Sequence, residues 1–154
     1  MFEIYTLKKY IKMANTLTFT STPFLQCYTM DTGTSNNTKY SILDSNVSDR
    51  RIYGIAVSST DAGAQTVKIH LNDGSTSYQA FTINIPLNSG NSTSVSSVDI
   101  MGSAYGASIF QKQRDANGVP YFNLPANWKV EAEYGTTFTG SEALNFFVFG
   151  ESYA

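Results

Sequence analysis

Cysteine and histidine are almost absent from this sequence, which has one of each among its 154 residues. The lone cysteine, Cys27, excludes an intramolecular disulfide and a thiolate metal cluster, and a single histidine, His70, leaves no zinc motif to be drawn. Alternation around His70 places it on the solvent face of a strand with no evident link to Cys27, so we expect no Cys–His catalytic pair. Cys27 is instead expected to be a small buried hydrophobe. The sequence therefore predicts no catalytic residue, no metal ligand and no cofactor.

Charge is also scarce, since only 14% of the residues are Asp, Glu, Lys or Arg and the net charge is −2. No basic field exists to neutralise phosphates, so nucleic acid is not an expected partner. Long apolar runs are missing as well, and neither a secretory signal nor a membrane span is expected. Disorder is excluded by the ten tyrosines and ten phenylalanines.

The first twelve residues differ from all that follow, because they combine lysines with bulky apolar residues and contain no Gly or Ser. We interpret residues 1–12 as an N-terminal arm or an upstream extension, with Met13 as the hypothetical natural start. Residues 13–154 then form one domain, because 154 residues are too few for two domains of ordinary size.

Alternating apolar and polar residues predict strands along the whole of this domain. The segment Asp49–Pro86 contains three consecutive strands, which we interpret as an antiparallel meander with a turn at Asn72–Gly74. We expect a further strand at positions 17–19, which ends before a break at Pro23. The other expected strands are at 24–29, 39–43, 95–101, 119–124, 128–134 and 144–153. Residues 102–113 are ambiguous between strand and helical turn. Eight to ten short strands predict an all-β, jelly-roll-like antiparallel β-sandwich.

Two carboxylates invite a catalytic interpretation, because Glu131 and Glu133 are two residues apart on one strand and would stand about 7 Å apart. Charged residues that alternate with Trp128, Val130 and Ala132 are also what any half-exposed strand carries. We favour a solvated face.

Aromatic residues offer a second alternative, a sugar-stacking platform of the kind found in carbohydrate-binding proteins. Its candidate contacts are Trp128, Tyr105 and Tyr121, although Trp128 shares the parity of core residues and we favour a core position for it.

Subunit contacts are expected from the sheet edges and from the strongly apolar last strand, which needs cover. The candidate contact residues are Arg50, Arg51, Phe146, Phe147 and Phe149, and a homo-oligomer is expected. The loop 31–38 and the arm 1–12 are further candidate contact regions.

The segments Arg51–Asp61, Thr66–Gly74 and Leu124–Thr137 resemble small structural proteins of tailed-bacteriophage particles. The resemblance extends from Arg51 to the C-terminus, and the polar composition also suits crAss-like phages. It implies a non-enzymatic virion protein that assembles with other virion proteins, such as the major capsid protein or tail proteins.

Within that resemblance we expect a capsid decoration protein, also called an auxiliary capsid protein, that binds and stabilises the shell. The alternatives are a tail or head-fibre component and a carbohydrate-binding module that takes a glycan of the host surface as its ligand.

Overall fold

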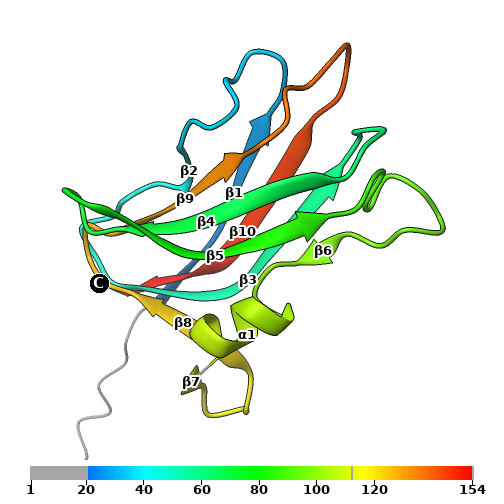
Figure 1. Cartoon of the computed structure of the whole chain (residues 1–154). Helices are drawn as coiled ribbons and strands as arrows, with labels where there is room; N and C mark the ends of the chain where they lie inside the picture. The colour runs from blue at the N-terminus through cyan, green and yellow to red at the C-terminus, as the bar shows by residue number, and fades with distance from the viewer. Residues whose placement is uncertain (1–20, 112, 154) are drawn as a thin grey trace, which may run out of the picture.

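The computed structural model describes residues 21–111 and 113–153, without the side chain of Tyr105. The arm 1–12 and the strand expected at 17–19 lie outside the described residues. Within them the chain forms ten strands and one short helix, arranged as two antiparallel sheets that face each other (Figure 1). The prediction of an all-β sandwich is confirmed.

Sheet A has the strand order β1-β10-β3-β8-β7, with β6 paired to β3. Its strands are β1 (Ser21–Met30), β3 (Arg50–Ser59), β6 (Val98–Asp99), β7 (Gln113–Arg114), β8 (Pro120–Leu124) and β10 (Leu144–Tyr153). Sheet B has the order β2-β9-β4-β5. Its strands are β2 (Tyr40–Leu43), β4 (Gln65–Asn72), β5 (Ser77–Ile85) and β9 (Lys129–Tyr134).

Strand pairing is nested, as in a long hairpin that has been rolled up. The first strand β1 pairs with the last strand β10, β2 pairs with β9, β3 with β8, and β4 with β5. Additional pairs, β10 with β3 and β9 with β4, complete the two sheets. This nested order is that of a jelly roll.

The expected three-stranded meander is only partly correct. The hairpin of β4 and β5 forms around Asn72–Ser77 as the turn residues indicate, with Gly74 at φ 97°. Strand β3, however, crosses to sheet A instead of pairing with β4. Alternation identifies a strand and its buried face, but it does not identify the strand's partner.

One local expectation needs correction, and one open alternative is decided. Pro23 does not end a strand but lies within β1, where the edge position of β1 in sheet A leaves the missing N–H without a ladder bond to make. The ambiguous segment 102–113 forms helix α1 (Ala104–Phe110), whose N-terminus is capped by the Ser103 hydroxyl accepting the Gly106 amide.

The core lies between the sheets and consists of aliphatic and aromatic side chains of alternate strand positions, such as Ile55, Val57, Ile69, Phe146 and Val148. Helix α1 closes one side of it, because the Phe110 ring packs 5.5 Å from that of Phe81 and 4.8 Å from that of Phe122. In the described part of the chain, no helix is long and apolar enough to cross a membrane.

Candidate functional site

The outer face of sheet A carries a group of exposed apolar side chains, here called the apolar patch: Leu25, Cys27, Phe147 and Phe149. Leu25 pairs with Phe149, and Cys27 with Phe147, across the β1–β10 ladder. Because the four positions share one parity, their side chains form a contiguous block. Leu25 is 66% exposed, Phe147 38% and Phe149 45%. Contiguous exposed apolar surface of this kind typically marks a contact with another molecule.

A glycine under the patch determines how Phe149 lies. Gly54 of β3 is paired with Phe149, and a Cβ atom at Gly54 would stand 2.0 Å from Cζ of the Phe149 ring. The end of the ring therefore occupies the space that a side chain at position 54 would fill, so glycine at this position permits the contact. The patch thus extends from β10 onto β3.

Next to the apolar patch lies a second group, here called the tyrosine–arginine cluster: Arg51, Tyr53, Tyr121, Glu151 and Tyr153. The guanidinium carbon of Arg51 is 4.7 Å from the centre of the Tyr121 ring and 4.6 Å from that of Tyr153. Arg51 Nη1 is 3.9 Å from Glu151 Oε1. The cation is therefore held between two aromatic rings beside a carboxylate.

An irregularity in the ladder places Tyr53 in this cluster. Gly54 pairs with Phe149 but Ile52 pairs with Gly150, so Tyr53 is the extra residue of a β-bulge. Its hydroxyl donates to Glu151 Oε1 at 2.5 Å, and the Tyr153 hydroxyl donates to the same oxygen.

These hydrogen bonds determine the charge of the cluster. Hydrogen bonds from Ser21, Tyr153 and Tyr53, in that order, lower the pKa of Glu151. Burial, and then the bond to Glu151, raise the pKa of Tyr153. At neutral pH Glu151 is ionised and Tyr153 is neutral, so the Arg51 charge is balanced within the cluster.

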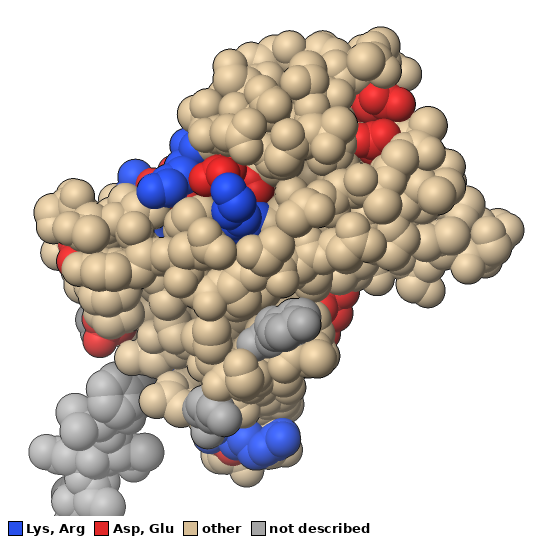
Figure 2. All heavy atoms as spheres, viewed as in Figure 1, with Lys and Arg blue, Asp and Glu red and all other residues tan. Residues whose placement is uncertain are grey.

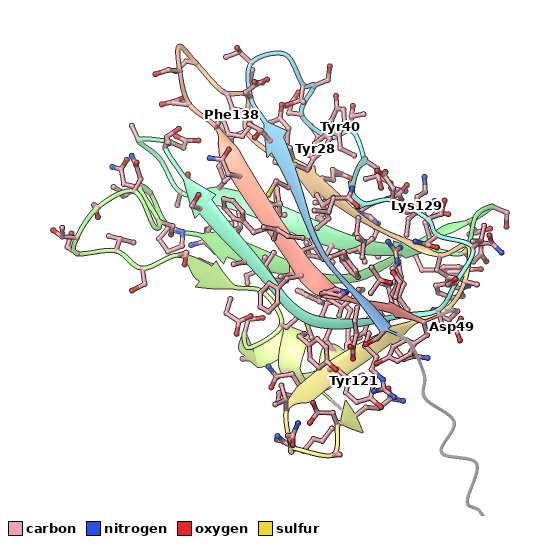
Figure 3. The ribbon with its side chains drawn as sticks, turned by 180° about the vertical axis from the view of Figure 1, so that it is seen from behind. Tyr28, Tyr40, Asp49, Tyr121, Lys129 and Phe138 are labelled. Carbon is pink, nitrogen blue, oxygen red and sulfur yellow. The ribbon has the colours of Figure 1, made fainter. Side chains whose placement is uncertain are left out.

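A pocket of about 530 Å³ opens beside Arg51 and Tyr153. The remaining lining comes from two connections and one strand: Val47, Ser48, Asp49, Asn123 and Ala126. Seen from the sheet A side, Asp49 and Tyr121 lie at the same end of the sandwich, opposite the end that carries Phe138 (Figure 3).

Of the five expected contact residues, three lie on the outer face of sheet A and two are buried. Arg51, Phe147 and Phe149 point outward from sheet A and remain available for contacts. Phe146 is 0% exposed and belongs to the core, and Arg50 is 5% exposed. The interpretation of Phe146 and Arg50 as surface contacts is therefore wrong, because both have the inward parity of their strands.

Arg50 has a structural role at the end of the core. Its Nη2 donates to the backbone carbonyl of Asp44 and, at 3.3 Å, to that of Trp128, and its guanidinium carbon lies 5.6 Å from the centre of the Phe24 ring. Burial lowers the pKa of Arg50. The cation thus ties the end of β2 to the start of β9.

The expected aromatic ligand contacts do not form one platform. Trp128 is partly buried and packs against the core, in agreement with the favoured interpretation. Tyr121 lies on the outer face beside Arg51. Tyr105 is in α1, and its side chain is outside the described part of the structure.

The outer face of sheet B carries a charged cluster: Lys39, Lys68, His70, Lys129, Glu131 and Glu133. Figure 2 shows adjoining blue and red side chains on this face. The prediction that this face is solvated is wrong for three members of the cluster. Glu131 is 5% exposed, Glu133 8% and His70 4%. The parity of these positions in the sequence does not reveal their burial.

Each carboxylate in the charged cluster is paired. Lys68 Nζ is 2.5 Å from Glu133, and Lys129 Nζ is 2.8 Å from Glu131, which also accepts hydrogen bonds from Ser77 and Asn72. Burial by itself would raise the pKa of Glu131, but the hydrogen bonds outweigh burial and the pKa is lowered. This differs from a glycosidase acid, whose pKa must be raised.

Three residues on the outer face of sheet A could not be identified as candidates from the sequence: Glu151, Tyr153 and Cys27. Glu151 and Tyr153 lie near the end of β10, and Cys27, expected to be buried, is exposed. The sequence of β1 does not distinguish its two faces, because apolar residues stand at both parities: Leu25 and Cys27 are exposed, whereas Phe24 and Tyr28 are partly buried.

Within the described residues, no group of three or more His, Cys, Asp or Glu side chains is arranged to hold a metal ion. A comparison with models of protein families finds no match, and a comparison with curated protein sequences finds no significant match.

Proposed function

We propose that this protein is a structural component of a tailed-bacteriophage particle, which decorates the capsid by docking the outer face of sheet A on the shell. The observation that carries the proposal is the apolar patch. An exposed block of Leu25, Phe147 and Phe149 on rigid paired strands is suited to burial against another protein.

The resemblance of Arg51–Asp61 and Leu124–Thr137 to phage structural proteins supports the same function. The jelly roll is a fold that viral capsid proteins use. No covalent chemistry is required, since the work of a decoration protein is contact between subunits.

Many equivalent sites on the shell explain how a small patch on each copy can be enough for stable binding. Each copy buries only a few large side chains, but a shell presents many equivalent sites. Linked or assembled copies therefore bind with an avidity that exceeds the affinity of one contact.

The experiment adds purified protein to particles from which it has been removed and measures binding by co-sedimentation. Phe147→Ser and Phe149→Ser together are expected to reduce binding at least about tenfold, because each removes a large buried ring at the interface. Leu87→Ser is the matched control, since Leu87 is 47% exposed but follows β5 of sheet B.

Equal binding of the double variant and the wild type would contradict the proposed docking face. Absence of the chain from purified native particles would contradict the virion function itself. Binding confined to tails would replace decoration by a tail function.

A further inference from the structure

The pocket beside the tyrosine–arginine cluster has the composition of a ligand site that is separate from the apolar patch. Its walls come from the β2–β3 connection, with Ser48 and Asp49, and from the β8–β9 connection, with Ala126. Arg51 and Tyr153 also line the pocket. A volume of about 530 Å³ lies within the range of small-molecule sites.

The walls are fixed in place before any ligand arrives. The Ala126 amide donates to Asp49 Oδ1 at 2.7 Å, and the Asn127 amide donates to the Asn46 carbonyl at 2.6 Å, so the two connections are tied together. The Tyr153 amide donates to the Asp49 carbonyl at 3.0 Å. A pre-organised site loses little conformational entropy on binding.

The polar groups of the pocket combine acceptors and donors. Asp49 accepts from the Ala126 amide through Oδ1, and among the described residues its second carboxylate oxygen has no hydrogen-bond donor and can accept from a ligand. Asn123, the direct cross-strand partner of Arg51, offers an amide that both donates and accepts. Arg51, whose side chain is 36% exposed, contributes guanidinium donors.

This combination matches the hydroxyl groups of a sugar, each of which donates one hydrogen bond and accepts others. The apolar side of a sugar ring needs an aromatic or aliphatic wall, which Tyr153, Val47 and Ala126 supply. Val47 is 87% exposed, so this wall is accessible.

Charge argues against an anionic ligand. Among the described residues that line the pocket, Arg51 is the one cation, whereas Asp49 lines the same pocket and Glu151 stands 3.9 Å from Arg51. A phosphate or carboxylate would meet two like charges. From this geometry we propose that the pocket binds a neutral hexose unit of a glycan.

The test is a titration of the full ¹⁵N-labelled chain with glucose, galactose, mannose and N-acetylglucosamine, each added separately and followed by amide chemical shifts. At least one sugar is expected to bind in the millimolar range and to shift the amides of Asp49, Arg51 and Asn123. Asn123→Ala and Arg51→Ala are each expected to weaken that binding about tenfold, the equivalent of one lost hydrogen bond to the ligand.

Tyr78→Ala is the matched control, because Tyr78 is an exposed tyrosine of sheet B. This variant is expected to bind the sugar as tightly as the wild type does. No shift with any of the four sugars would overturn the proposal, and so would unchanged affinity in the Asn123→Ala and Arg51→Ala variants. Binding of inorganic phosphate in place of sugars would also overturn it. Asn123→Ala is expected to bind particles as the wild type does. Failure of the sugar-site proposal is therefore distinguishable from failure of the decoration proposal.

Discussion

Adjacent arginines in this chain have opposite roles, because β3 alternates between the core and the outer face. Arg50 is buried against two backbone carbonyls, and Arg51 is exposed between two tyrosines. The doublet Arg50–Arg51 could be singled out from the sequence as a pair. Which member points inward depends on the register of β3, and the contacts of Arg50 also depend on Trp128, which is 78 residues away in the sequence.

Arg50→Ala is expected to lower the free energy of unfolding by about 2–4 kcal/mol, because hydrogen bonds from a charged group are lost and two carbonyls lose their donor. Arg51→Ala, the matched control, is expected to change it by about 1 kcal/mol or less, as is usual for an exposed charge. Urea denaturation measures both values. Equal effects of the two substitutions would contradict the assigned burial.

His70 is expected to make stability depend on pH near neutrality. Its imidazole lies within the charged cluster, and both ring nitrogens are buried without a hydrogen bond, although Nε2 is 3.5 Å from Glu133 Oε2. The charged groups that face it are Lys39, Glu133, Glu131 and Lys68. Burial, followed by the charge of Lys39, lowers the pKa of His70 below 6.5 despite the two glutamates.

The unfolded chain therefore binds a proton at His70 more readily than the folded chain does. The free energy of unfolding is expected to fall as the pH drops below about 6.5 and to level off below the folded-state pKa. Because His70 is the single histidine, His70→Gln is expected to abolish this dependence. Urea denaturation at pH values between 7.5 and 5 measures this dependence. If the free energy of unfolding changes with pH as steeply in His70→Gln as in the wild type, His70 is not its source.

At the scale of elements, the positions of the strands were more predictable from the sequence than the pairing between strands. The alternation of Val67, Ile69 and Leu71 identifies β4 and its core side, and Asn72–Gly74 identifies the turn after it. The same alternation in β3 gives no sign that β3 leaves β4 for sheet A. The bulge at Tyr53 is equally invisible, since it depends on the partner strand β10.

The loop 31–38 is a polar connection, as its composition indicates, but it is anchored to the core. The Tyr134 hydroxyl, on a fully buried side chain, donates to the Thr34 carbonyl at 2.8 Å, and the Ser35 amide donates to the Tyr40 hydroxyl at 2.7 Å. The sequence identifies Tyr134 as a core residue of its strand. The sequence does not indicate that its hydroxyl reaches a loop one hundred residues earlier.

Tyr134→Phe is expected to cost about 1 kcal/mol of stability and to speed hydrogen exchange of the Thr34 and Asn37 amides, because the loop loses its buried anchor. Tyr78→Phe, which alters an exposed tyrosine, serves as the control. Unchanged exchange in the Tyr134→Phe variant would show that the loop is held by other contacts.

At the scale of the whole molecule, nested pairing creates the candidate surfaces. Leu25 and Phe149 meet because the first described strand lies beside the last, and Arg51 meets Tyr153 and Tyr121 because β3 lies between β10 and β8. Sequence reasoning separated Arg51 and Tyr121 into different hypotheses, and the fold brings them into one cluster. Only knowledge of the topology could have predicted that.

We propose that the outer face of sheet A uses its apolar patch for protein contact and the pocket beside it for a ligand. Such a division suits a subunit that is fixed to a shell by one surface and keeps another open. Self-association through the same patch, which would give the expected homo-oligomer, is measurable by sedimentation equilibrium of the wild type against the Phe147→Ser and Phe149→Ser double variant.

Cryo-electron microscopy of native particles tests the central claim most directly. We predict jelly-roll density on the capsid, oriented so that Leu25, Phe147 and Phe149 are buried against the shell. Density oriented with sheet A toward solvent, or capsids that lack the protein, would contradict the account.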